Sequence, residues 1–259
     1  MISTIRTPDK QVDNDNDPPT YQETITGIEE MQVQFLWDNQ TVRRTFIRKV
    51  YAILMVQLLV TVGIVALFTF CAPVRFFIQT HPSLYMASSL LFFATYIALS
   101  CCGDLRRQVP WNIILLVIFT LSMAFMMGFV SSFYNTKSVM LCLGITAIVC
   151  FSIIVFSFQS KVDVTSCQGF LFSLCMVMLL GALVLTAVPF GYIPWLQAIC
   201  AVFGAILFTL FLAFDTQMLL GNKHVSISPE EYVFATLSIY LDIIYLFSFL
   251  LQLAGGGRE

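Results

Sequence analysis

The chain has 259 residues, of which 58% are hydrophobic and only 11% are charged, and its formal net charge is -2. Soluble domains carry about 25% charged residues, so this composition excludes a soluble globular protein and indicates a polytopic membrane protein. The lipid bilayer is then the surrounding partner, and we expect no nucleic-acid partner.

The first 36 residues are polar. They include an Asn-Asp-Asn-Asp-Pro-Pro run and too few apolar side chains to form a core, so we expect residues 1–36 to be a disordered tail. Pro18, Pro19 and Tyr21 belong to a Pro-Pro-x-Tyr sequence, which as a polyproline II turn is a ligand for the aromatic groove of WW domains. A WW-domain ubiquitin ligase is therefore a candidate partner, and chance occurrence of this short motif is the alternative.

Seven stretches of about 20 apolar residues follow, and each is long enough to cross about 30 Å of hydrocarbon. They run near residues 50–70, 84–102, 111–131, 138–158, 169–190, 195–220 and 233–253. The links between them are about a dozen residues or shorter, so consecutive helices are expected to pack as antiparallel neighbours. The sequence thus predicts an all-α integral membrane protein, with a seven-helix transmembrane domain at residues 37–254 and a short tail at residues 255–259.

Lys and Arg side chains near the span ends are distributed unevenly between the two sides of the membrane. If the N-terminus is cytoplasmic, that side has eight of them: Arg43, Arg44, Arg48, Lys49, Arg106, Arg107, Lys161 and Lys223. The other side has three: Arg75, Lys137 and Arg258. The positive-inside rule therefore predicts a cytoplasmic N-terminus, and seven crossings place the C-terminus in the lumen or outside the cell. A last segment that re-enters without crossing would instead return the C-terminus to the cytoplasm.

The eight cysteines and two histidines do not form a metal-binding or disulfide pattern. There is no Cys-x-x-Cys sequence, and the two histidines lie in separate loops. Cys101 and Cys102 are the exception, because they lie next to Arg106 and Arg107 at a cytoplasmic span end and form a candidate palmitoylation site. We expect no resident cofactor.

Only two acidic or basic side chains lie deep inside the predicted spans, Asp215 in the sixth and Asp242 in the seventh. A charge at the bilayer centre costs at least about 2.5 kcal/mol, so an intramembrane acid indicates a functional site. The two helices are joined by a short loop on the cytoplasmic side, and both carboxylates are expected to meet in that half of the bundle. Ser238 and Tyr245 recur with Asp242 at helical spacing and form a supporting polar stripe.

Two carboxylates in a medium of low dielectric cannot both ionise cheaply, and they tend to share one proton. Such a pair is a pH sensor. It is also a transient site for Ca²⁺, which prefers six to eight oxygen ligands and would be held incompletely by Asp215 and Asp242. Incomplete coordination suits passage of the ion better than storage. The alternative is a structural pair whose shared proton only joins two helices.

Several stretches of the chain are similar to one known family. They are Val42-Arg43-Arg44-x-Phe46, the motif at residues 157–167, Phe208 to Gln217 around Asp215, and residues 228–245 around Asp242. In these stretches, and over about residues 37–253, the chain resembles the Lifeguard branch of the transmembrane Bax inhibitor motif family.

This resemblance implies a seven-helix fold with the last helix central, residing in Golgi, endoplasmic reticulum, endosomal or plasma membranes. It implies calcium-leak behaviour, suppression of apoptosis including death-receptor signalling, and contact with death-receptor or Bcl-2-type proteins. In that family paired aspartates of the sixth and seventh helices form a pH-sensitive gate, and Asp215 and Asp242 match those positions.

Three other classes of membrane protein are alternatives to a calcium leak. An intramembrane aspartyl protease needs Gly-x-Gly-Asp around its second aspartate and a later Pro-Ala-Leu; neither occurs here, so we expect no enzyme. A heptahelical receptor would have an external N-terminus, which the charge distribution opposes. The remaining alternative is a non-conducting membrane adaptor that blocks apoptosis through protein–protein contacts.

Overall fold

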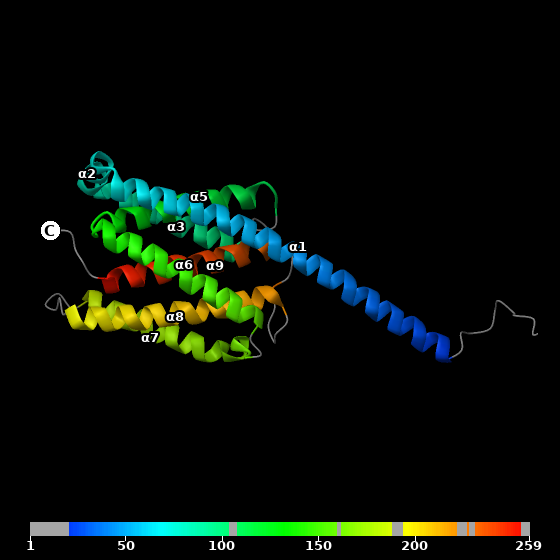
Figure 1. The fold of residues 1–259 in the computed structure, drawn as a ribbon. Coiled ribbons are helices and arrows are strands. Elements are labelled where there is room, and N and C mark those ends of the chain that lie inside the picture. Colours follow the sequence, from blue (N-terminus) through cyan, green and yellow to red (C-terminus); the bar gives the residue numbers. More distant parts are fainter. Residues whose placement is uncertain are drawn as a thin grey trace, which may run out of the picture. The chain divides into compact units, whose positions relative to one another are not determined.

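The computed structural model describes residues 21–103, 108–159, 162–187, 194–221, 227 and 231–254. The elements in these ranges are helices (Figure 1). In chain order they are α1 (Tyr21–Phe70), α2 (Ala72–Thr80), α3 (Pro82–Cys101), α5 (Trp111–Ser131), α6 (Thr136–Gln159), the 3-10 helix η1 (Val164–Cys167), α7 (Gln168–Ala187), α8 (Pro194–Leu220) and α9 (Tyr232–Ala254).

Within the described ranges, seven helical segments are long and apolar enough to cross a membrane. They are Thr41–Phe70, Pro82–Cys101, Trp111–Ser131, Thr136–Gln159, Val164–Gly181, Gln197–Leu220 and Tyr232–Ala254. This confirms the prediction of an all-α multi-pass membrane protein, and both ends of α5 and the C-terminal end of α8 fall at the predicted residues.

Two segments differ from what the sequence predicts. α2 forms where the sequence predicts only a break between two spans. Pro73 is compatible with this helix because it lies in the first turn, where the backbone N–H that proline lacks would have no intrahelical partner. α1 begins at Tyr21, so it includes residues 21–36, which we expected to be disordered. That stretch contains Glu, Met and Gln, all good helix formers, and it continues into the first span. Residues 1–20 and 255–259 lie outside the described part.

The chain divides into two compact units, Met1–Val42 and Arg43–Glu259, and the second unit contains both Asp215 and Asp242. Its centre is α9, which packs against α3, α5, α6 and α8 (Figure 1). Of the most apolar 18-residue window of α9, 61% is buried, against 11–44% in the other six spans. The last helix is therefore central, as the resemblance implies.

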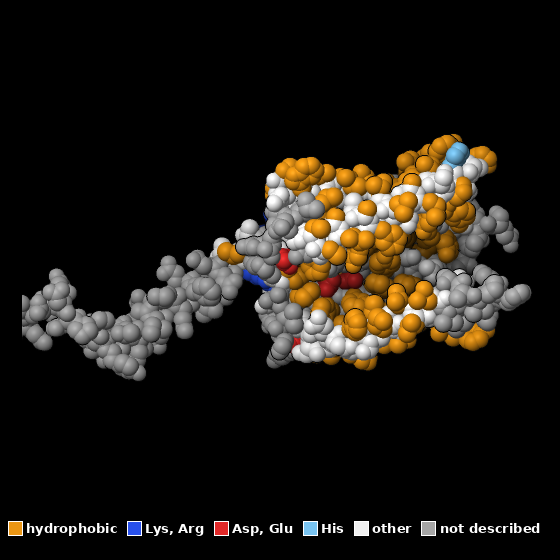
Figure 2. Space-filling view, turned by 180° about the vertical axis from the view of Figure 1, so that it is seen from behind, with side chains coloured by type: hydrophobic (Ala, Val, Ile, Leu, Met, Phe, Trp, Pro, Cys, Tyr) orange, Lys and Arg blue, Asp and Glu red, His pale blue; other side chains and the backbone are white. Residues whose placement is uncertain are grey.

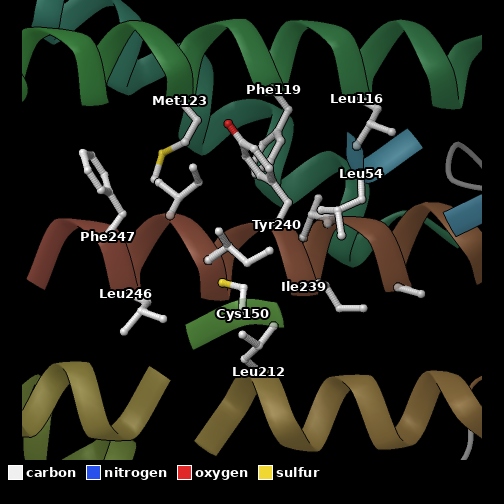
Figure 3. Close-up of a cluster of buried hydrophobic side chains, with 14 of the residues drawn as sticks. Leu54, Leu116, Phe119, Met123, Cys150, Leu212, Ile239, Tyr240, Leu246 and Phe247 are labelled. Carbon is white, nitrogen blue, oxygen red and sulfur yellow. The ribbon is translucent and has the colours of Figure 1, made fainter. Parts of the chain in front are cut away.

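Polar side chains of α1, α5 and α9 pair with one another inside the second unit. Gln57 donates from Nε2 to Thr120 Oγ1 at 2.7 Å, and the hydroxyl oxygens of Thr61 and Tyr240 lie 2.8 Å apart. Figure 3 shows Tyr240 among apolar side chains of the core, with its ring centroid 6.0 Å from that of Phe119. Buried polar groups in a lipid-embedded bundle need such partners, since hydrocarbon offers none.

The outer surface of this unit is apolar. Leu59, Leu90 and Phe151 are 67%, 72% and 70% exposed, and hydrophobic side chains are spread widely over the described part of the face in Figure 2. In water such a surface would drive aggregation. In a bilayer it is the surface that lipid chains cover, so the distribution of polar and apolar groups agrees with the span assignment.

We expect Tyr240→Phe to lower the free energy of unfolding by about 0.5–1.5 kcal/mol, because it removes one buried hydrogen bond while Thr61 keeps its bond to the Gln57 carbonyl. Equilibrium unfolding by a denaturing detergent in mixed micelles measures this change. Thr80→Ala is the control, since that hydroxyl is exposed and should cost almost nothing. Equal losses in the two variants would contradict the role given to the Thr61–Tyr240 pair.

Candidate functional site: a buried carboxyl pair

The structure brings Asp215 of α8 and Asp242 of α9 together inside the bundle. The two helices share the most extensive interface among the described elements, and the two side chains are only 9% and 6% exposed. The two carboxyl groups are close enough to interact electrostatically. A carboxylate can only accept hydrogen bonds, so a direct hydrogen bond between the two groups would need one of the carboxyls to be protonated.

Little else in the described ranges compensates for the pair. Asp242 Oδ2 has no hydrogen-bond partner among the described residues, and the Cys150 thiol of α6 also interacts electrostatically with Asp242. Among the described residues, no Lys or Arg forms an ion pair with either carboxyl. Figure 2 shows acidic side chains in a hollow of an otherwise apolar face. The pair therefore depends on its own proton for neutrality.

As a site for a cation, the pair is small. Among the described residues, no group of three or more His, Cys, Asp or Glu side chains could hold a metal ion. Asp215 and Asp242 together provide at most four carboxylate oxygens, whereas Ca²⁺ prefers six to eight. The remaining ligands would have to be water and backbone carbonyls, which favours brief occupancy by a passing ion.

On one side of the pair, α8 and α9 are held together by aromatic rings. The Phe208 ring lies 5.0 Å from the Tyr245 ring and 5.7 Å from the Phe249 ring, centroid to centroid. A Cβ at Gly204 would come within 2.6 Å of Phe249, so the glycine allows this close approach. Small residues commonly permit such packing in membrane helices.

The predicted polar stripe has a different environment from the one expected. Tyr245 is half-buried and packs by its ring on Phe208, and Ser238 is half-buried. In the described part of the chain, neither side chain hydrogen-bonds to Asp215 or Asp242. Their spacing along α9 is as predicted, but a role in supporting the acids stays a prediction.

On the other side of the pair, the end of α8 is held by Arg43 of α1. The guanidinium donates to three carbonyl oxygens: Nη1 to Ile227 at 2.6 Å, Nη2 to Met218 at 2.8 Å and Nε to Leu220 at 3.3 Å. We call this set of contacts the Arg43 clamp. From the sequence, Arg43 is predicted only to be a cytoplasmic positive charge. The signal that could indicate a further role is its place in the Val42-Arg43-Arg44-x-Phe46 motif.

Gln217 makes a second connection at the same end of α8. Its Nε2 donates to the Val162 carbonyl at 3.0 Å and its Oε1 accepts from the Val164 N–H at 2.8 Å. Asp163, between them, caps η1 by accepting from the Thr165 N–H. The motif residues around 157–167 and 208–217 are thus joined in space, two residues beyond Asp215.

The remaining predicted sites are only partly described. Cys101 ends α3 and Cys102 follows it, both exposed, while Arg106 and Arg107 lie outside the described residues. Pro18 and Pro19 also lie outside them, and Tyr21 is the first residue of α1.

Comparison with known proteins places the chain in a family. Residues 43–259 match the family model described as inhibitor of apoptosis-promoting Bax1. The chain belongs to this family. Protein lifeguard 3 of Homo sapiens is 51% identical over 220 residues, covering 85% of this chain and 71% of the human protein. The Golgi anti-apoptotic protein of vaccinia virus (strain Lister) is 34% identical over 212 residues, covering 82% and 85% respectively.

These matches confirm the resemblance to the Lifeguard branch. The protein is a membrane protein of the anti-apoptotic Bax inhibitor and Lifeguard family. The matched region begins at Arg43 and includes both Asp215 and Asp242.

The contact between the carboxyls gives a stability prediction that does not depend on function. Asp215→Ala and Asp242→Ala should each change the free energy of unfolding, and the double variant should differ from their sum by about 0.5–3 kcal/mol, as residues in contact do. Detergent unfolding of the four proteins gives this coupling energy. Strict additivity would show that the two carboxyls do not interact.

Proposed function

We propose that this protein is a pH-sensitive calcium leak channel with anti-apoptotic activity, and that the Asp215–Asp242 pair is its gate. The observation that carries the proposal is the buried contact of two carboxyls without a described counter-cation. Ca²⁺ is the substrate of this activity.

The proton on the pair sets the state of the gate. With the proton present, one carboxyl donates to the other and holds α8 against the central helix α9. When the proton leaves, two negative charges remain in contact in a medium of low dielectric and repel each other. That repulsion separates the helices, and an entering Ca²⁺ neutralises both carboxylates until it moves on.

The anti-apoptotic part of the proposal follows the relatives. The vaccinia virus protein is named for anti-apoptotic action in the Golgi, and the family model for inhibition of apoptosis-promoting Bax1. We propose residence in Golgi, endoplasmic reticulum, endosomal or plasma membranes, and suppression of death-receptor signalling through death-receptor or Bcl-2-type partners. A WW-domain ubiquitin ligase is the proposed partner of the tail. If the Tyr21→Ala variant is pulled down by such a ligase as well as the parent protein is, the ligase is not a partner of this motif.

The gate predicts a specific pH response. Ca²⁺ flux through purified protein in liposomes should rise as pH rises, because proton loss creates the repulsion. Asp215→Asn and Asp242→Asn should each flatten this response, and the double variant should be little worse than either one, since the two residues act as a unit. Additive effects, or an unchanged pH profile in either variant, would show that the pair is not the gate.

The same assay separates the channel from a non-conducting adaptor. An adaptor would show no Ca²⁺ flux at any pH, and it would retain suppression of death-receptor signalling after both carboxylates are replaced. Loss of suppression together with loss of the pH response supports the channel.

Topology gives another prediction. Because Lys and Arg side chains collect on one side of the spans, a tag on the N-terminus should be accessible only from the cytosol and a tag on the C-terminus only from the lumen or outside. Protease protection in sealed membranes measures both. A C-terminal tag reached from the cytosol would mean that α9 does not cross.

A further inference from the structure

We propose that Arg43 is a positioning residue for the carboxyl pair: the Arg43 clamp fixes the end of α8 and thereby the place where Asp215 meets Asp242. This inference rests on the proposed function for its effect on Ca²⁺ flux. Its effect on the geometry of the pair does not depend on that function.

The clamp satisfies groups that α8 cannot satisfy alone. The last four carbonyls of a helix have no intrahelical partner, and the C-terminus carries the negative end of the helix dipole. Arg43 donates to Met218 and Leu220 in the last turn of α8 and to Ile227 beyond it. One planar guanidinium thus joins the end of α8, and the chain that follows it, to α1.

The surroundings of the guanidinium hold it in one position. It lies 5.2 Å from the centre of the Phe46 ring, and that ring is itself buried. Gly221 follows α8 at φ +68°, the left-handed conformation that glycine adopts most readily at a helix end. A Cβ at this position would overlap the guanidinium, so the clamp also needs the absence of a side chain there.

The clamp is close enough to the pair to control it. Asp215 lies three residues before Met218, which is about 4.5 Å along the helix axis and less than one turn. Thr216 and Gln217, between them, are fully buried. A helix is stiff over one turn, so a displacement of its clamped end moves Asp215 with it.

α8 is therefore fixed on both sides of Asp215 by contacts of different kinds. The ring contacts of Phe208 hold one side of it to α9, whereas the Arg43 clamp holds the other side to α1. If the clamp opens, the end of α8 can move away from the central helix while the aromatic contacts persist. We expect Asp215 to lose its contact with Asp242 in that movement.

Loss of the contact between Asp215 and Asp242 is measurable because few other titratable groups surround the pair. Among the described residues, those that interact with the two carboxyls are the carboxyls themselves and the Cys150 thiol, and the Tyr51 phenol lies against Thr216. The infrared C=O band of the protonated carboxyl therefore reports on the pair. It is distinct from thiol and phenol signals.

The test compares Arg43→Gln with Arg44→Gln in the full-length protein reconstituted in liposomes. Arg44 is exposed, and Arg44→Gln removes the same charge, so this variant is the matched control. In Arg43→Gln we expect the protonated-carboxyl band to disappear at a lower pH than in the parent, because separated acids no longer share a proton. Ca²⁺ flux at acid pH should increase several-fold. Arg44→Gln should resemble the parent in both measurements.

Two milder variants keep the proposal testable if Arg43→Gln fails to fold. Arg43→Lys retains the charge but not the planar fork, and it should shift the band in the same direction by a smaller amount. Gly221→Ala should produce the shift without removing any charge. Gly144→Ala is its control, because a Cβ there would contact nothing.

The proposal would be overturned if the carboxyl band of Arg43→Gln titrates as in the parent protein while amide exchange over residues 216–221 becomes faster. Arg43 would then act only as a helix cap. An equal shift in Arg44→Gln would overturn it too, since charge alone would then explain the effect. A parent that conducts no Ca²⁺ at any pH would refute the proposed leak, whereas the infrared comparison would still decide whether Arg43 positions the pair.

Discussion

The contact of two carboxyl groups inside hydrocarbon is the constraint on which the rest of this structure depends. An isolated carboxylate in the membrane interior has no water to solvate it, so it must be covered by protein and kept neutral or paired. Asp242 is covered because α9 lies at the centre of the second unit, and Asp215 because α8 packs along α9. Each acid then has the other as its principal partner. In the proposed gate, a proton shared by the two carboxyls makes this contact favourable and also makes it sensitive to pH.

The interactions around the pair divide between the two ends of α8. Ring contacts and the close approach at Gly204 bind one part of α8 to α9. Hydrogen bonds from Arg43 and Gln217 bind the other part to α1 and to the segment around η1. Because hydrocarbon gives no hydrophobic drive for helix association, these packing and hydrogen-bond contacts determine how α8 sits. A change at Asp215 can thus alter one helix without unfolding the bundle.

The sequence predicts the spans well and indicates the two buried acids within them, because both follow from local composition. A run of 20 apolar residues has one explanation in a membrane protein, and an acid within it is conspicuous. The sequence does not predict α2, because Pro73 reads as a helix break although it lies in the first turn of a helix. Nor does it predict the Arg43 clamp, which joins residues more than 170 positions apart and uses backbone carbonyls that carry no sequence signal. Likewise, the spacing of Tyr245 predicts the face of α9 on which it lies. The spacing does not predict that its ring packs on Phe208.

The most direct test of the account is to follow the shared proton and the leak in the same liposomes. The infrared band of the protonated carboxyl, assigned by its loss in Asp215→Asn and Asp242→Asn, would be titrated alongside Ca²⁺ flux through the parent protein. The account predicts that the band disappears and the flux rises over the same pH interval, with a common midpoint. A flux that titrates in a different interval, or that persists unchanged while the band is lost, would contradict it.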